Sequence, residues 1–152
     1  MNKSWIANGF TAANALFGGL SIMMSISGEY HVAAICILFA MAADAFDGRV
    51  ARALGTAGPM GVELDSLSDD ISFGVAAGAL MYSYQLRELG ALGFIPCALL
   101  GAFCAFRLAR FNVKVTSVHG YFEGLPCPTV GVIIACYVLS GVKIWNWLAM
   151  VC

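Results

Sequence analysis

Long apolar runs are the feature of this sequence that most constrains its fold. Runs of about twenty predominantly apolar residues recur along the chain, and a helix of that length is what crosses the hydrocarbon core of a bilayer. Hydrophobic residues make up 61% of the 152 positions and charged residues only 11%, against roughly 25% charged residues in soluble domains. We therefore predict an all-α fold, a polytopic transmembrane helix bundle.

The apolar runs predict five clear spans and a partial sixth within one domain, residues 1–152. The predicted spans are residues 6–26, 32–53, 60–82, 91–111 and 129–142. The first run has no clear small-residue cleavage site, so we interpret it as a span and not as a removed signal peptide. After Lys143 the chain reads IWNWLAMVC. This segment is either an interfacial Trp-rich end or the start of a sixth span that the chain does not complete.

Lysines and arginines predict the orientation of the bundle, because cytoplasmic loops carry the excess of both. If the N-terminus is cytoplasmic, six basic residues fall on the cytoplasmic side: Lys3, Arg49, Arg52, Arg107, Arg110 and Lys114. Only Arg87 and Lys143 fall on the opposite side. We therefore expect a multi-pass integral membrane protein of the cell or inner membrane, with its N-terminus in the cytoplasm.

Net charge and cysteine spacing argue against two other classes of site. The formal net charge is −1, so charge alone suggests no nucleic-acid partner. The six cysteines show neither a CxxC pair nor a Cys/His spacing typical of a metal site, and most lie in apolar stretches. We interpret them as small buried apolar side chains.

One polar stretch interrupts the apolar pattern: DAFDGRVARALGTAGPMGVELDSLSD, residues 44–69. At helical spacing, one stripe at the inner end of the second predicted span carries small and charged residues, namely Asp44, Asp47, Gly48, Ala51 and Arg52. One face of the third predicted span carries Gly61, Asp65 and Asp69, spaced by four. A tight turn between two antiparallel helices brings these four aspartates together.

Four carboxylates close together at the edge of a bilayer repel one another and need cations. Two arginines cannot neutralise four acids held this close, whereas a hard divalent ion with oxygen ligands can. The alternative is that the aspartates are helix caps or loop residues at the membrane surface. Asp70 points about 100° away from the face of Asp65 and Asp69, so we leave it out of the predicted site.

The spacing Asp44-x2-Asp47-Gly48-x2-Ala51-Arg52-x8-Gly61-x3-Asp65-x3-Asp69 resembles, at every fixed position, the signature of the CDP-alcohol phosphotransferase family. Further stretches resemble the serine-accepting branch of that family, the integral-membrane phosphatidylserine synthases: NGFTAANALFGGLS, ELDSLSDDISFGVA, FRLARFNV and YFEGLPCP. Asp70 departs from this branch, in which an apolar residue is expected. The resemblance implies a six-helix membrane domain, usually a homodimer, with a metal site near the cytoplasmic face.

The resemblance also implies a reaction, in which CDP-diacylglycerol and L-serine give phosphatidylserine and CMP. By the same resemblance, Mg²⁺ or Mn²⁺ is held by four carboxylates: Asp44, Asp47, Asp65 and Asp69. Asp69 is in addition the implied general base for the serine hydroxyl. CDP-diacylglycerol is expected to lie against three of the aspartates and the residues that give it room or pair with it: Asp44, Asp47, Asp65, Gly48, Ala51, Arg52 and Gly61.

The acceptor pocket has two interpretations. A serine carboxylate suits a bidentate arginine, and Arg107 and Arg110 at the inner end of the fourth predicted span, with Asn112 nearby, could supply one. Alternatively, both arginines are anchors that reach the lipid headgroups. Glu123 could balance the serine ammonium group or could be a solvated loop charge.

Two other functions stay open on the sequence. The arginines would bind glycerol phosphate or inositol phosphate as readily as a carboxylate, so the acceptor could be a phosphorylated alcohol. Intramembrane acids could also mark a cation transporter or channel. That function predicts acids spread along a path across the membrane, whereas here they cluster at one end of two spans.

Overall fold

The computed structural model describes residues 4–54, 59–115 and 126–142, and side chains within 8–50, 60–112 and 126–142. Every element in these ranges is a helix, which confirms the all-α prediction for this part of the chain. The elements are α1 (Ser4–Ser27), α2 (Tyr30–Leu54), α3 (Pro59–Asp69), η1 (Asp70–Val75), α4 (Ala76–Tyr84), η2 (Leu86–Leu89), α5 (Ala91–Val115) and α6 (Cys127–Leu139). The element η1 is a π-helix and η2 a 3₁₀-helix.

Three helical segments in the described ranges are long and apolar enough to cross a membrane: Asn8–Ser27, Tyr30–Val50 and Ala91–Asn112. The predicted span at residues 60–82 consists of α3, η1 and α4 in direct succession. The predicted span at residues 129–142 corresponds to the 13-residue α6. The count of five spans therefore stays a prediction, and the predicted partial sixth span lies outside the described residues.

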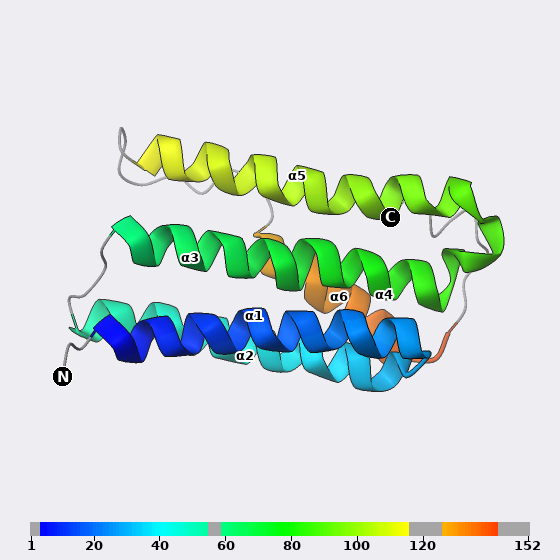
Figure 1. Cartoon of the computed structure of the whole chain (residues 1–152), viewed down its shortest axis with the longest axis horizontal. Helices are drawn as coiled ribbons and strands as arrows, with labels where there is room; N and C mark the ends of the chain where they lie inside the picture. Colours follow the sequence, from blue (N-terminus) through cyan, green and yellow to red (C-terminus); the bar gives the residue numbers. More distant parts are fainter. Residues whose placement is uncertain (1–3, 55–58, 116–125, 143–152) are drawn as a thin grey trace.

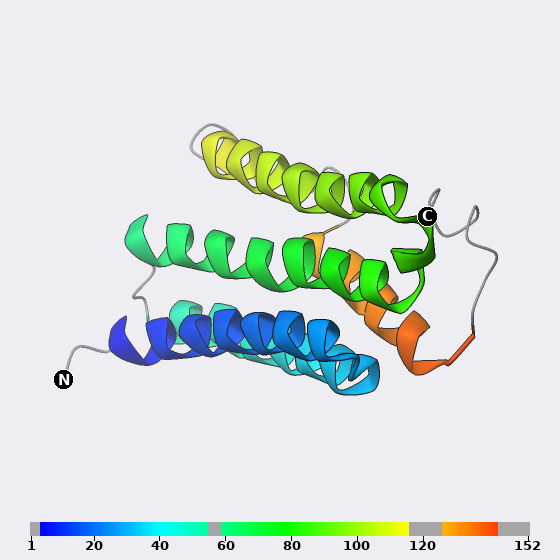
Figure 2. The ribbon, with the colours of Figure 1, turned by 45° about the vertical axis from the view of Figure 1, so that its right-hand side comes forward.

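The helices lie side by side in a bundle (Figures 1 and 2). The antiparallel pair α1 and α2 packs against the α3–η1–α4 rod, and α5 lies on the opposite side of that rod (Figure 2). Helix α6 crosses beside α2 and α4. The start of α1, the end of α2, the start of α3 and the end of α5 all lie at one end of the bundle (Figure 1). The polar stretch, which contains the end of α2 and the start of α3, therefore lies at this end of the bundle.

The turn between α1 and α2 is fixed by local sequence. Gly28 has a φ of +87°, a left-handed conformation that glycine adopts without strain. The Gly28 N–H donates to the Ser25 carbonyl at 3.3 Å and the Glu29 N–H to the Met24 carbonyl at 3.0 Å. This pair of bonds is the Schellman motif that ends a helix, so α1 stops here and α2 returns antiparallel to it.

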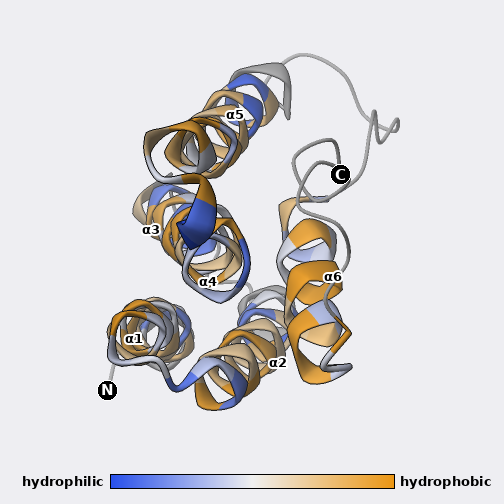
Figure 3. Cartoon of the chain, turned by 90° about the vertical axis from the view of Figure 1, so that its right-hand side faces the viewer, coloured by the Kyte–Doolittle hydropathy of each residue, from blue (hydrophilic) through white to orange (hydrophobic). Residues whose placement is uncertain are grey.

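Alanines and a few larger apolar residues fill the centre of the bundle. Buried apolar side chains gather where α2, η1, α4 and α6 meet: Ala33, Ala34, Ile37, Ala40, Phe73, Ala77, Leu80, Ala135 and Val138. Many other large apolar side chains are exposed, and α6 in particular consists mostly of hydrophobic residues (Figure 3). On α5, for example, Phe103 and Phe106 are 66% and 75% exposed. Alanines between the helices and exposed large apolar side chains are typical of helices packed in lipid.

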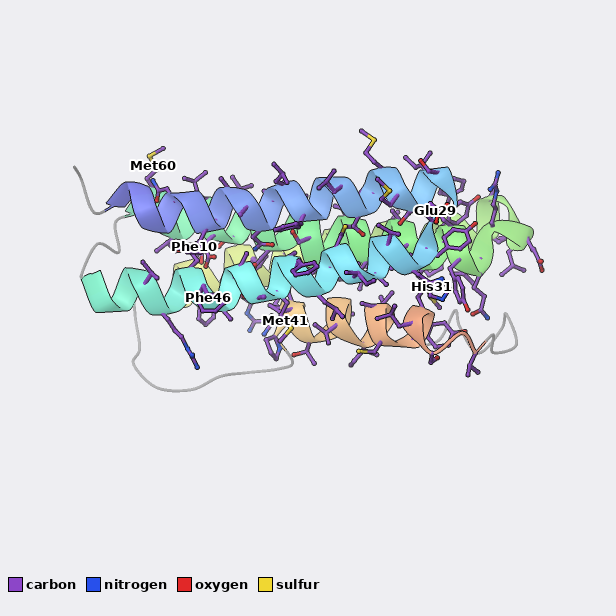
Figure 4. All side chains as sticks on the ribbon, turned by 90° about the horizontal axis from the view of Figure 1, so that it is seen from below. Phe10, Glu29, His31, Met41, Phe46 and Met60 are labelled. Carbon is purple, nitrogen blue, oxygen red and sulfur yellow. The ribbon has the colours of Figure 1, made fainter. Side chains whose placement is uncertain are left out.

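The two ends of the bundle differ in their side chains. Phe10 of α1 and Phe46 of α2 lie side by side, with ring centroids 6.3 Å apart, at the same end as Met60 of α3 (Figure 4). Glu29 and His31 lie at the other end (Figure 4). The acidic stretch thus belongs to the end that Phe10 and Phe46 mark.

Two adjacent glycines of α1 test how closely it packs on η1. A Cβ added at Gly18 would lie 2.9 Å from Ser72 Cα, whereas one added at Gly19 would meet nothing within 4 Å. We expect Gly18→Ala to destabilise the fold by about 1–3 kcal/mol, the usual cost of overpacking. Gly19→Ala should be neutral or slightly stabilising, because alanine favours helix. Thermal denaturation in detergent micelles measures both; equal effects would contradict the close approach.

Candidate active site

Three aspartates from two helices converge at one point in the bundle. Asp44 comes from α2, and Asp65 and Asp69 come from α3, where their spacing of four places them on one face. One carboxylate oxygen of each lies within 4.8 Å of the others. Asp69 is buried, with 8% of its surface exposed, whereas Asp44 and Asp65 are half-buried. The site is therefore closed on one side and accessible on the other.

The cluster cannot hold three negative charges without a counter-charge. At the 4.8 Å limit between ligand oxygens, each pair of charges repels by about 3.5 kcal/mol for an effective dielectric constant of about 20. Three pairs cost about 10 kcal/mol, which is comparable with the whole stability of a typical domain. A bound cation or proton must therefore offset the repulsion. Asn14 donates a hydrogen bond to Asp69 and Thr11 donates one to the neighbouring Asp47, and neither donor carries a charge.

Asp47, the fourth predicted ligand, stands beside this cluster. Its side chain is buried, with 5% of its surface exposed, and its Oδ2 accepts a hydrogen bond from the Thr11 hydroxyl of α1. Asp47 is still close enough for its charge to repel those of Asp44 and Asp65. The structure thus gathers three of the four predicted carboxylates around one point and bonds the fourth to α1.

Helix α1 supplies two site residues that the sequence analysis did not single out. Besides the Thr11 contact, the Asn14 Nδ2 donates a hydrogen bond to Asp69 Oδ1 at 3.1 Å. Both side chains are buried, Asn14 completely. Their spacing of three places them on one face of a predominantly apolar helix. Polar residues at such a spacing inside a predicted span are the signal that could have identified them.

The small residues predicted to make room at the site are only partly described. Gly48 is exposed and Gly61 half-buried. A Cβ added at Gly61 would have Asn8 Oδ1, 4.0 Å away, as its nearest neighbour, so Gly61 borders open space. Ala51 and Arg52 belong to α2, but their side chains lie outside the described ones.

The predicted acceptor residues lie on the last turns of α5. The Arg107 Nη1 contacts the Cys127 Sγ at 3.4 Å, where α6 begins. Arg110 is exposed. The Asn112 Nδ2 donates to the Ser66 hydroxyl at 3.0 Å, and Ser66 follows Asp65 directly. Asn112 therefore joins the end of α5 to the acidic face of α3, while Glu123 lies outside the described residues.

Asp70 occupies a different environment from its neighbour Asp69. It is the first residue of the π-helix η1, and its Oδ1 is buried with no hydrogen-bond partner. A Cβ added at Gly74 would lie 2.7 Å from that oxygen, so the glycine leaves room for the Asp70 carboxylate. Asp70 is not among the three clustered aspartates. The π-helical turn, a rare element often found at functional sites, thus begins directly after Asp69.

The donor set of the cluster suits a divalent cation. All three candidate ligands are carboxylate oxygens, which are the ligands that hard ions such as Mg²⁺ prefer. Asp44 and Asp65 are partly open, which leaves coordination positions for water or for a substrate phosphate. The residues present therefore fit a divalent metal ion.

The fold and the site together define a class of protein: an apolar helical bundle, with helices long enough to cross a membrane, that carries a candidate divalent-cation site near one end. The family model described as CDP-alcohol phosphatidyltransferase matches residues 4–152. The chain belongs to this family, as the aspartate spacing indicated, and its members generally use a divalent metal.

Three proteins from other organisms are similar to most of this chain. A CDP-diacylglycerol–serine O-phosphatidyltransferase of Helicobacter pylori is 38% identical over 87% of this chain and 56% of its own length. An archaetidylserine synthase of Methanothermobacter thermautotrophicus is 40% identical over 84% and 55%. A CDP-diacylglycerol–serine O-phosphatidyltransferase of Bacillus subtilis is 38% identical over 80% and 68%. The chain spans about half the length of the first two of these relatives.

Proposed function

We propose that this protein transfers the phosphatidyl group of CDP-diacylglycerol to the hydroxyl of L-serine and releases CMP. The observation that carries the proposal is the cluster of Asp44, Asp65 and Asp69 within 4.8 Å, in a chain of the CDP-alcohol phosphatidyltransferase family. The names of all three relatives contain serine, whereas the lipid part of the name is the same in two of them and differs in the third. The relatives therefore support serine as the acceptor more strongly than they support diacylglycerol as the lipid of the donor.

The proposed metal ion is Mg²⁺ or Mn²⁺, held by Asp44, Asp65 and Asp69 with Asp47 beside them. Such an ion neutralises the pyrophosphate of the donor and the charge that develops on the leaving CMP. The half-buried carboxylates of Asp44 and Asp65 are on the side where a phosphate can approach. The buried Asp69 is on the side that α1 covers.

Asp69 is the proposed general base. A free hydroxyl is a weak nucleophile at neutral pH, so a positioned carboxylate that takes its proton accelerates the attack. The serine oxygen forms a bond to the phosphorus that bears the diacylglycerol, its proton passes to Asp69, and the bond from that phosphorus to the CMP oxygen breaks. CMP leaves with the electron pair of the broken bond.

The proposed CDP-diacylglycerol site extends from the acidic cluster along α2 and α3. It comprises the residues Asp44, Asp47, Gly48, Ala51, Arg52, Gly61 and Asp65. The glycines carry no side chain, so the cytidine and phosphates can lie close to both helices, and Arg52 is proposed to pair with a phosphate. The open space beside Gly61 supports this placement.

Arg107 and Arg110, with Asn112, are proposed to bind the serine carboxylate. Arg107→Ala and Arg110→Ala should each raise the serine KM by about tenfold or more, because a lost charge-assisted hydrogen bond costs about 1.5–3 kcal/mol. The KM for CDP-diacylglycerol should change much less. Steady-state kinetics in mixed micelles measure both constants, with Arg87→Ala, in η2 before the start of α5, as the control. Equal increases in both constants would assign the arginines to the lipid pyrophosphate.

We further propose a multi-pass membrane domain over residues 1–152, with five spans, a site that faces the cytoplasm and a homodimeric state. The three apolar helices and the count of basic residues on each side support the topology, and the family resemblance supports the dimer. Cysteine accessibility from each side of sealed vesicles tests the orientation. Light scattering of the detergent-solubilised protein tests the dimer.

The proposed function is tested by CMP release from CDP-diacylglycerol with purified protein and Mg²⁺ or Mn²⁺. L-serine, glycerol 3-phosphate and inositol phosphate are compared as acceptors. Release that depends on serine, with phosphatidylserine as the lipid product, supports the proposal. Release only with a phosphorylated alcohol would keep the acidic site and reassign the arginines to a phosphate. No release with any acceptor from a folded protein would favour a cation transporter.

A further inference from the structure

We infer that Asn14 of α1 is a positioning residue that holds the Asp69 carboxylate in the orientation in which it receives the proton of the acceptor hydroxyl. The inference rests on the proposed function, in which Asp69 is the general base. It adds a role for α1, a helix to which none of the predicted site residues belongs. Four observations on the described side chains carry it.

The first observation is the contact between the two side chains. The Asn14 Nδ2 donates to Asp69 Oδ1 at 3.1 Å, across 55 positions of sequence. The Asn14 side chain has no exposed surface and Asp69 only 8%, so water does not compete for this bond. A carboxylate turns easily about its last bond, and a fixed donor on one oxygen limits that rotation. The bond therefore orients the Asp69 carboxylate within the cluster.

The second observation is that Asn14 is itself held in place. The Ser72 hydroxyl donates to the Asn14 backbone carbonyl at 2.9 Å. Ser72 lies in the π-helix η1, which begins one residue after Asp69. The segment that directly follows Asp69 therefore also bonds to the backbone of Asn14. The two segments are joined at two points, so the backbone from which the Asn14 side chain projects is fixed relative to Asp69.

The third observation is the close approach of the two backbones. A Cβ added at Gly18, one turn after Asn14, would lie 2.9 Å from Ser72 Cα. A glycine at this position lets α1 pack directly on η1. Helix α1 can thus bring the short Asn14 side chain within reach of Asp69.

The fourth observation is that the asparagine is a poor choice for stability alone. Its Oδ1 is buried and has no hydrogen-bond partner, and an unsatisfied buried polar atom costs about 1–3 kcal/mol. An apolar side chain in this fully buried position would avoid that cost, but it would leave Asp69 Oδ1 without this bond. A polar residue kept despite it points to a function for the amide group, and the bond to Asp69 is the contact that this amide makes.

The test compares Asn14→Ala with Ser21→Ala. Ser21 is a matched control, because it is also fully buried on α1 and donates to the Ala33 carbonyl at 2.9 Å, far from the aspartates. Losing a group that orients a site residue typically costs about 10–100-fold in activity. We expect Asn14→Ala to lower kcat for serine-dependent CMP release by that factor. The KM values for serine and CDP-diacylglycerol should stay within about threefold, and Ser21→Ala should retain kcat.

Asn14→Asp is the second variant, because it keeps the shape of the side chain and removes the donor. It should lower kcat at least as much as Asn14→Ala, since a carboxylate in place of the amide repels Asp69. Mn²⁺ binding, followed by electron paramagnetic resonance, separates a positioning effect from loss of the metal. Asn14→Ala should still bind Mn²⁺ at a saturating concentration, and its lower kcat is measured at that concentration.

Three results would overturn the inference: unchanged kcat in both Asn14 variants, a loss that resides in KM, or an equal loss in Ser21→Ala. If Asn14→Ala does not fold, Asn14→Asp decides the matter on the same criterion. Failure of the proposed function is distinguishable, because the unmodified protein would then release no CMP with serine.

Discussion

Asp69→Asn lowers kcat for serine-dependent CMP release by about 10²–10⁴, the range for loss of a general base, while Asp70→Asn stays near the activity of the unmodified protein. The two residues are adjacent, so the pair is a matched comparison. Asp69 belongs to the three-carboxylate cluster and bonds to Asn14. Asp70 lies outside that cluster, beside Gly74. Asparagine keeps the shape of aspartate but accepts a proton far less readily.

The comparison needs only CMP release at saturating substrates, with both variants purified in the same detergent. A thermal denaturation curve of each variant confirms that it is folded. Equal loss in the two variants would mean that general disturbance of the α3–η1 junction controls activity. Full activity of Asp69→Asn would remove Asp69 from the proposed proton transfer.

Chelation of divalent ions is the second large effect. With EDTA in excess, turnover should fall to the background rate, because the repulsion among Asp44, Asp65 and Asp69 is then relieved by protons and not by an ion that can bind phosphate. Added Mg²⁺ or Mn²⁺ should restore activity. Loss of a residue that only supports a metal ligand costs about 10–100-fold in metal affinity. Asp44→Asn and Asp65→Asn remove a ligand itself, so each should raise the metal concentration for half-maximal activity by at least that factor.

Glu63→Gln is the control for these two variants, because Glu63 is an exposed acid on α3 that is not part of the cluster. Its metal requirement should be unchanged. Turnover that persists in EDTA, or a metal requirement that moves equally in all three variants, would contradict a metal role for the aspartates.

Much of the fold and of the acidic site follows from local sequence patterns. The apolar run at residues 6–26 lies within α1, and the run at 91–111 forms most of α5. Both runs are predictable because a helix needs about 20 apolar residues to cross a bilayer. The spacing of Asp65 and Asp69 fixed their common face on α3. These predictions depend only on residues near one another in sequence, so no tertiary information was needed.

The contacts of α1 could not be predicted in the same way. Asn14 and Asp69 are 55 positions apart, and no sequence periodicity states which helix faces which. The π-helix η1 could not be predicted from the sequence either. It packs against α1, α5 and α6, and local sequence does not state which helices meet there. Asp47 shows what spacing alone leaves out. Its spacing predicts a metal ligand, and the bond described for its side chain is one that it accepts from Thr11.

The central claim is that the three clustered aspartates hold the divalent ion at which phosphatidyl transfer takes place. X-ray anomalous scattering from a crystal of the active protein grown with Mn²⁺ tests it most directly. A single strong peak within coordination distance of oxygens from Asp44, Asp65 and Asp69 is the predicted result. An active protein whose Mn²⁺ peak lies away from these carboxylates, or that binds no Mn²⁺ there at saturating concentration, would contradict it.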